Sequence, residues 1–138
     1  MSWKEKVKEF GGGDINFLSG DGEVLDCVIC GDPVLLEGKF KGKVQQRIGV
    51  PIVSEEGFSL FITGKRLARK LSKFEDKFEV CAFRIVRHGE ENDVNSSYPI
   101  TILDDVEVTK TLLALKATEF NQTALDEAIV YAVEVMNA

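Results

Sequence analysis

The chain has 138 residues, of which 44% are hydrophobic, and its 17 lysines and arginines are outnumbered by 23 aspartates and glutamates. A chain of this length buries roughly two-thirds of its surface in one core, so it needs neither disulfides nor a structural metal to fold. Its apolar stretches are far shorter than the ~20 residues of a membrane-spanning helix, and its charged opening residues are unlike a secretory signal. We therefore expect a cytoplasmic protein with no membrane partner, whose three cysteines remain reduced.

The first predicted elements are a short helix followed by β-strands. Ser2 and Glu5 have the spacing of a capping box, which predicts a helix from there to about Phe10. Three glycines at positions 11–13 end this helix, because consecutive glycines are costly within one. From Ile15 onward, short apolar runs are broken by Gly, Asp, Pro and Ser, as is typical of strands. Strands are expected over residues 23–36, 43–53, 58–63, 78–87 and 98–103, the first one bent at residues 30–33.

Further helices are predicted between the third and fourth strands and after the fifth. Apolar residues recur at helical spacing over residues 64–74, with basic residues around the remainder, which predicts an amphipathic helix. Residues 106–138 repeat in the same way and predict two helices, the second capped by Asn121 or Thr123.

This order of three strands, a helix and two strands is that of the five-stranded OB barrel, a Greek-key barrel that binds oligonucleotides on one face. We therefore expect an α+β fold, mainly β with helices, in a single OB-fold domain over residues 1–138. The barrel is expected over about residues 15–105, and a helical segment over about residues 106–138.

Charge is distributed unevenly along the chain. Residues 39–88 contain twelve basic and five acidic side chains, a balance of +7, whereas the residues before them carry −5 and those after them −8. A basic centre with acidic flanks indicates a polyanion partner, although a basic stretch also serves simply as a solvated surface. Lys65 and Arg66 begin the predicted 64–74 helix, whose positive end favours phosphate contacts.

Candidate DNA-binding residues follow from what single-strand binding requires, namely cations for the backbone and flat side chains on which bases stack. The segment over residues 39–43 interleaves an aromatic ring with three lysines beside flexible glycines. Strand alternation places Lys43 and Arg47 on the outward face of one strand, and Arg84 and His88 on the outward face of another. We predict contacts to single-stranded DNA from Lys39, Phe40, Lys41, Lys43, Arg47, Phe61, Lys65, Arg66, Arg84, Arg87, His88 and Tyr98.

Some of these residues have a structural alternative. Arg84 and Arg87 are three residues apart, so they cannot both face outward from a regular strand. For Arg87 the alternative role is a salt bridge with Glu90 or Asp93. Most phenylalanines fall in apolar patterns and are expected in the core. Phe61 is favoured among them for DNA, because alternation sets it opposite its apolar neighbours.

Other chemistries find little support in the sequence. Cys27 and Cys30 have the C-x-x-C spacing of a zinc or redox site, but on a strand their side chains point to opposite faces, so buried thiols are expected. Cys81 and His88 are too far apart along one strand for a nucleophile and its base. Carboxylates occur mainly beside turns. We therefore expect no cofactor, no metal site, no catalytic residues and no enzymatic activity.

Three segments carry a resemblance to a known family. Residues 61–71 (FITGKRLARKL), 83–89 (FRIVRHG) and 98–104 (YPITILD), with an acidic loop containing Asp93, resemble the single-stranded-DNA-binding proteins of tailed bacteriophages, which have an OB fold. The resemblance covers about residues 20–105. It implies sequence-independent binding and protection of single-stranded DNA during phage-type replication or recombination, in the host cytoplasm.

The same resemblance implies replication or recombination proteins as partners. This chain ends in an apolar helix, however, and lacks both the long acidic tail that usually recruits such partners and the zinc-finger insertion of some relatives.

A second interpretation remains open, in which the chain is an OB-type interaction or assembly domain whose basic face binds an acidic protein partner. The last predicted helix, with Leu125, Ile129, Val133 and Met136 on one face, packs either on its own barrel or on a neighbour's. In the latter arrangement it would form a homodimer.

Overall fold

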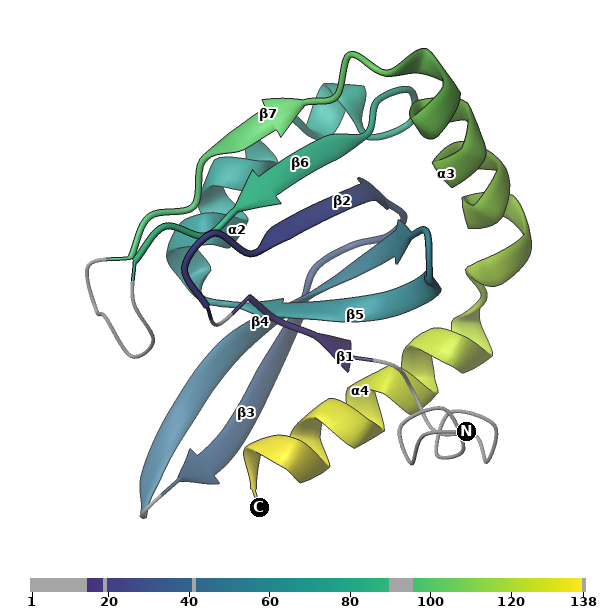
Figure 1. Ribbon diagram of the computed structural model, residues 1–138. Coiled ribbons are helices and arrows are strands. Elements are labelled where there is room, and N and C mark those ends of the chain that lie inside the picture. Colours follow the sequence, from purple (N-terminus) through teal and green to yellow (C-terminus); the bar gives the residue numbers. More distant parts are fainter. Residues whose placement is uncertain (1–14, 19, 41, 90–95, 138) are drawn as a thin grey trace, which may run out of the picture.

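The computed structural model describes residues 15–18, 20–40, 42–89 and 96–137, apart from the side chain of Phe40. Within these ranges the chain is an α+β protein with seven strands, three α-helices and one 3₁₀ helix (Figure 1). The elements are β1 (Ile15–Asn16), β2 (Val24–Ile29), β3 (Val34–Phe40), β4 (Lys43–Ser54), β5 (Gly57–Thr63), α2 (Lys65–Ser72), the 3₁₀ helix η1 (Glu75–Lys77), β6 (Phe83–Val86), β7 (Ile100–Ile102), α3 (Val106–Glu119) and α4 (Gln122–Met136). The helix predicted to run to Phe10 lies outside the described residues.

The strands form one mixed sheet in the order β1-β5-β4-β2-β6-β7, and β3 pairs with β4 beside this path. All of these pairings except that of β1 with β5 are antiparallel. The pairings of β2 with β4, β4 with β5, β2 with β6 and β6 with β7 join the strands that the sequence predicts. The short β1 adds a parallel strand to β5, with Ile15 opposite Leu60.

The predicted five-stranded OB barrel is not confirmed, because the sheet is open. Its path ends at β1 on one side and at β7 on the other, and no pairing among the described residues joins the two ends. In a closed barrel the last strand would pair with the outer edge of β5, but here β1 pairs with that edge. The last strand, β7, is only three residues long and pairs with β6.

The predicted bent first strand is two strands, β2 and β3, separated by residues 30–33. The last hydrogen bond before the break runs from the N–H of Cys30 to the Pro51 carbonyl, at 3.0 Å. Pro33 has no N–H with which to continue the ladder. Beyond this bend, β3 and β4 form a long hairpin whose outer half projects from the body (Figure 1). We refer to residues 37–46 as the arm.

The predicted inward face of β4 is buried only in its second half. Val50 and Ile52 belong to the core, but Val44 lies on the arm and is 64% exposed. The predicted strand over residues 78–87 is likewise shorter, reduced to β6. The 3₁₀ helix η1 lies between Phe74 and Phe78. The rings of both residues pack on Phe83, at centroid distances of 5.5 and 5.8 Å, so Phe78 belongs to this turn and not to the strand.

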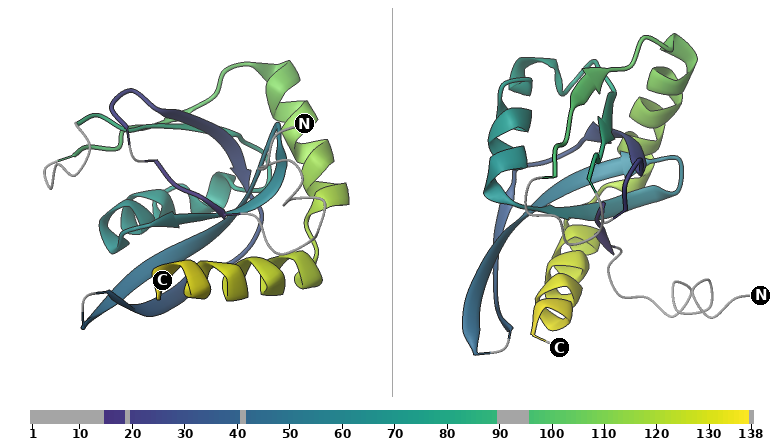
Figure 2. Two further views of the ribbon diagram at one scale, coloured as in Figure 1. Left: turned by 60° about the horizontal axis from the view of Figure 1, so that its bottom comes forward. Right: turned by 60° about the vertical axis from the view of Figure 1, so that its left-hand side comes forward.

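Both faces of the sheet are covered, which divides the core in two (Figure 2). Alternation along β5 sends Phe61 into the first cluster, with Leu67 and Leu71 of α2, and sends Leu60 into the second. The second cluster holds Leu112 of α3 together with Ala128 and Ala132 of α4.

Both C-terminal helices begin at a capping side chain, and the sequence predicted a cap for the second of them. The Asp105 side chain accepts from the N–H groups of Glu107 and Val108, and the Asn121 side chain accepts from that of Ala124. Asn121, rather than Thr123, is therefore the cap of α4. The apolar face of α4 packs on this chain's own sheet, so a homodimer through α4 would use its outward residues and stays a prediction.

Candidate nucleic-acid interface

A groove of about 340 Å³ opens where the arm joins the body. Its floor comes from β4 and β5, one wall from the residues that follow β1, and another from Tyr98 before β7. The lining residues are Phe17, Leu18, Arg47, Phe61, Ile62, Thr63, Gly64 and Tyr98. Four segments that are distant in sequence thus contribute to one groove.

Arg47 is the cation of this groove. It lies opposite Leu36 in the β3–β4 ladder, yet Leu36 is buried and Arg47 is exposed, because the hairpin leaves the body at this position. The Arg47 Nη1 atom would be 3.7 Å from a β-carbon on Gly64, the N-cap of α2. The guanidinium therefore lies beside the start of α2.

The N-terminus of α2 is open toward the groove. Gly64 provides no capping side chain, and the first turn contains no acidic residue, so the first amides keep their capacity to bind an anion. Lys65 and Arg66 are exposed there, as predicted. Lys65 Nζ donates to Gln46 Oε1 at 2.6 Å, and Gln46 Nε2 donates to Glu37 Oε1 at 2.7 Å, which links α2 to both strands of the arm.

The prediction for Phe61 as a stacking residue is wrong in this structure. Phe61 lies opposite Val50 in the β4–β5 ladder and shares its inward face, so its ring is only 1% exposed. A buried ring offers no face for a base, although Phe61 still forms part of the groove wall. Sequence alternation correctly set it opposite Leu60 but could not show that helices cover both faces.

Two other aromatic rings line the groove. Tyr98 is partly buried against the first core cluster, and its carbonyl accepts from Lys70 Nζ at 2.8 Å. Phe17 is 52% exposed and was not singled out by sequence reasoning. Its only sequence signal is a large ring between Asn16 and Leu18 in a polar stretch that looks like an ordinary strand start.

The arm carries the predicted lysines. Lys39 and Lys43 are both exposed near its end, where Phe40 pairs with Lys43 and Gly42 turns the chain with φ of +78°. The backbone N–H of Lys39 donates to Asn137 Oδ1 at 2.8 Å, and the Lys39 ammonium group takes no part in this bond. Lys41 and the Phe40 ring lie outside the described part of the chain.

Arg84 and Arg87 face different environments, which confirms that they do not both point outward. Arg84 is exposed and forms a bidentate pair with Asp26, through Nε at 2.8 Å and Nη2 at 2.9 Å. This hydrogen-bonded pairing with Asp26, together with its charge, raises the pKa of Arg84. Its cationic charge is therefore largely compensated by Asp26.

The prediction that Arg87 contacts DNA is not supported, because Arg87 is 4% exposed. Its guanidinium donates to the Gly89 carbonyl and to Ser96 Oγ, the latter at 2.8 Å. Arg87 thus ties together the two ends of the loop between β6 and β7, and its alternative partners Glu90 and Asp93 lie outside the described residues. His88, next to it, is exposed and pairs with Ser97 through the backbone.

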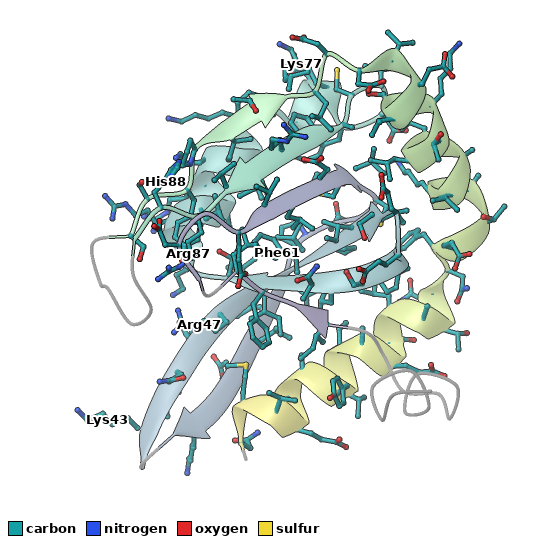
Figure 3. The ribbon with its side chains drawn as sticks, viewed as in Figure 1. Lys43, Arg47, Phe61, Lys77, Arg87 and His88 are labelled. Carbon is teal, nitrogen blue, oxygen red and sulfur yellow. The ribbon has the colours of Figure 1, made fainter. Side chains whose placement is uncertain are left out.

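Three of the predicted contact residues lie along one side of the molecule. In Figure 3, Lys43, Arg47 and His88 follow the left-hand edge from the arm to the β6–β7 loop, whereas Lys77 lies apart at the top. The groove opens midway along this edge, at Arg47.

Cys27 and Cys30 are buried free thiols, as expected. Cys27 belongs to the first core cluster and Cys30 to the second, so they point to opposite faces of the sheet. Burial raises the pKa of both thiols, that of Cys30 to about 12. Among the described residues, no three His, Cys, Asp or Glu side chains are placed to hold a metal ion.

Comparison with protein-family models, with curated proteins and with solved structures finds no match to this chain. In the part of the chain that the structure describes, no helix has both the length and the apolar character to cross a membrane.

Proposed function

We propose that this chain binds and protects single-stranded DNA without reading its sequence, during replication or recombination, and that it acts as a binder rather than an enzyme. This chain has the strand pairings of an OB fold apart from the one that closes the barrel, and these pairings support an open, OB-like scaffold for this role.

One observation carries the proposal: a guanidinium, an uncapped helix N-terminus and two accessible rings line the same groove. Arg47 and the first amides of α2 suit a phosphate, and Phe17 and Tyr98 suit bases. A cavity of about 150 Å³ already accommodates a benzene ring, so a groove of about 340 Å³ has room for a nucleobase.

The proposed path of the DNA follows from which surfaces of the sheet the helices leave uncovered. The outer face of β4 and β5, used by typical OB folds, is covered by α3 and α4. The DNA would therefore run from the lysines of the arm, past Arg47, toward His88. The charged residues of α4, namely Asp126, Glu127 and Glu134, are all acidic and would repel phosphates from the opposite side.

Fluorescence anisotropy with labelled oligo-dT across a salt series tests the proposal. Neutralising about three to five phosphates gives a slope of log K against log salt of about −2 to −3.5. Arg47→Ala should reduce the magnitude of this slope by about 0.7. Phe17→Ala removes a stacking partner and should weaken binding by about 1–3 kcal/mol.

Lys110→Ala is the matched control, because Lys110 is exposed on α3, away from the groove. A slope near zero would remove the electrostatic basis of the proposal, as would Arg47→Ala behaving like the control. Binding of an acidic polypeptide in place of oligo-dT would favour the interaction domain instead.

A further inference from the structure

A second cavity, of about 270 Å³, lies on another part of the molecule, between the β2–β3 bend and α2. Its floor is formed by Ile29, Val50, Leu71 and Phe78, all of which pack in the first core cluster. None of its lining residues lines the groove at Arg47. The cavity exceeds the roughly 150 Å³ that holds a benzene ring, so it has room for a large apolar side chain.

The rim of this cavity is acidic. The charged residues that line it, Asp32 from the bend and Glu75 from η1, are both carboxylates and both exposed. Neither has an ion-pair partner among the described residues. An apolar floor under two unpaired carboxylates fits an apolar side chain that is flanked by positive charges.

The arm of this same chain has that chemistry. In the sequence, Phe40 is the only aromatic residue with a basic residue on each side, Lys39 and Lys41. The described part of the arm agrees, because Val44 is 64% exposed, lies opposite Lys39 in the ladder and follows Lys43. The arm projects from the body, as an element that docks on another molecule must (Figure 1).

We propose that the cavity is the docking site for the arm of a second copy of this chain. Phe40 of the arm enters the cavity of the neighbouring copy, and the lysines beside it pair with Asp32 and Glu75 there. The two surfaces differ, so the interface is head-to-tail, and it leaves a free arm at one end and a free cavity at the other. This inference does not depend on nucleic-acid binding, although DNA and a neighbouring copy would compete for the arm.

Sedimentation velocity of the full chain without DNA, over a concentration series to about 1 mM, tests this inference. The wild type should self-associate at about 50 mM salt and less at about 500 mM, where ion pairs are screened. Phe40→Ala and the double variant Asp32→Lys/Glu75→Lys should each weaken self-association by at least about tenfold. Asp104→Lys/Glu55→Lys makes the same charge change at exposed positions outside the cavity and should have no such effect.

Mixing the two defective proteins gives the sharper test. Phe40→Ala keeps a working cavity, and Asp32→Lys/Glu75→Lys keeps a working arm. Together they should form a one-to-one complex that grows no further, because each supplies only one half of the interface. Asp32 and Glu75 are exposed, so these variants should fold, and their unfolding midpoints in urea check this.

Three outcomes would overturn the proposal: a wild type that stays monomeric throughout, a mixture that forms no complex, or a cavity variant that still self-associates. The last outcome would place the interface elsewhere, for instance on the outward face of α4. Oligo-dT affinity of the cavity variant, measured at dilute protein, should match that of Asp104→Lys/Glu55→Lys, which has the same net charge. The proposed DNA-binding function can therefore fail separately.

Discussion

A β-carbon on Gly38 would lie only 2.6 Å from the β-carbon of Met136, so the last turn of α4 rests directly on the backbone of β3. The contact is extended by Asn137, whose side chain accepts from the Lys39 N–H at 2.8 Å, across 98 residues of sequence. Because β3 pairs only with β4 among the described strands, Asn137 satisfies one edge N–H that would otherwise need water. The C-terminal helix thus supports the base of the arm.

Gly38→Ala should destabilise the protein by about 1–3 kcal/mol, because the new methyl group forces α4 away from β3. Urea unfolding followed by circular dichroism measures the loss. Lys39→Ala on the next residue, whose side chain is exposed, should change stability by less than about 0.5 kcal/mol. Equal effects from the two variants would contradict the close approach of Met136.

Asp26→Asn should strengthen single-stranded DNA binding, because it releases the Arg84 guanidinium from its bidentate partner. We expect roughly two- to fivefold tighter binding of oligo-dT, with a salt slope steeper by about 0.7. For the same reason, Arg84→Ala should cost less affinity than Arg47→Ala. Glu127→Gln removes one exposed negative charge from α4 and is the control for net charge. An equal gain from that control would show that Asp26 does not mask Arg84.

Asn121→Ala should destabilise the protein by about 0.5–2 kcal/mol, since it removes the side chain that accepts from the Ala124 N–H at 2.8 Å. Thr123→Ala, two residues later and exposed, should stay within about 0.5 kcal/mol of the wild type. Urea denaturation of both variants compares the two candidate caps. A larger loss at Thr123 would contradict the capping geometry.

Stability should fall at alkaline pH, because burial raises the pKa of Cys30 from its ordinary 9.0 to about 12. In the unfolded chain this thiol ionises near its ordinary pKa, whereas the folded state keeps it protonated. The associated stabilisation is therefore complete below pH 9.0 and is lost progressively as pH rises toward about 12. Burial also raises the pKa of Cys27, which adds to the effect.

Urea unfolding between neutral pH and about pH 10.5 measures this dependence. The difference in stability between the wild type and Cys30→Ala should shrink as the pH rises. Cys81→Ala, at a partly exposed position, is the comparison. A constant difference for Cys30→Ala over the whole range would mean that this thiol ionises equally in both states.

Local spacing was enough to predict most elements and one helix cap. The alternation over residues 43–53, the helical period over residues 64–74 and the capping side chain of Asn121 all act within a few residues of the backbone they organise. At residues 30–33 the sequence predicted a bend within one strand, where the structure has a break between β2 and β3; Pro33, which cannot donate a hydrogen bond, marked the position but not the full separation.

Placement of the site residues needed contacts that no local pattern contains. Alternation correctly separated Phe61 from Leu60, but only α2, and α3 and α4 on the opposite face, decide that both are buried. Arg87 is buried because its partners, Gly89 and Ser96, come from both ends of a loop. Phe17 became a groove residue only when β1 paired with β5, where the paired residues Ile15 and Leu60 are 45 positions apart in sequence.

By itself, the amino-acid sequence determined the order of strands and helices, the concentration of positive charge between residues 39 and 88, and the placement of Cys27 and Cys30 on opposite faces of the sheet. Only the tertiary structure decided that the sheet stays open, which rings remain accessible and which cations are already paired. The physical reason is that periodicity reports which residues share a face, whereas burial and pairing depend on what distant segments bring against that face.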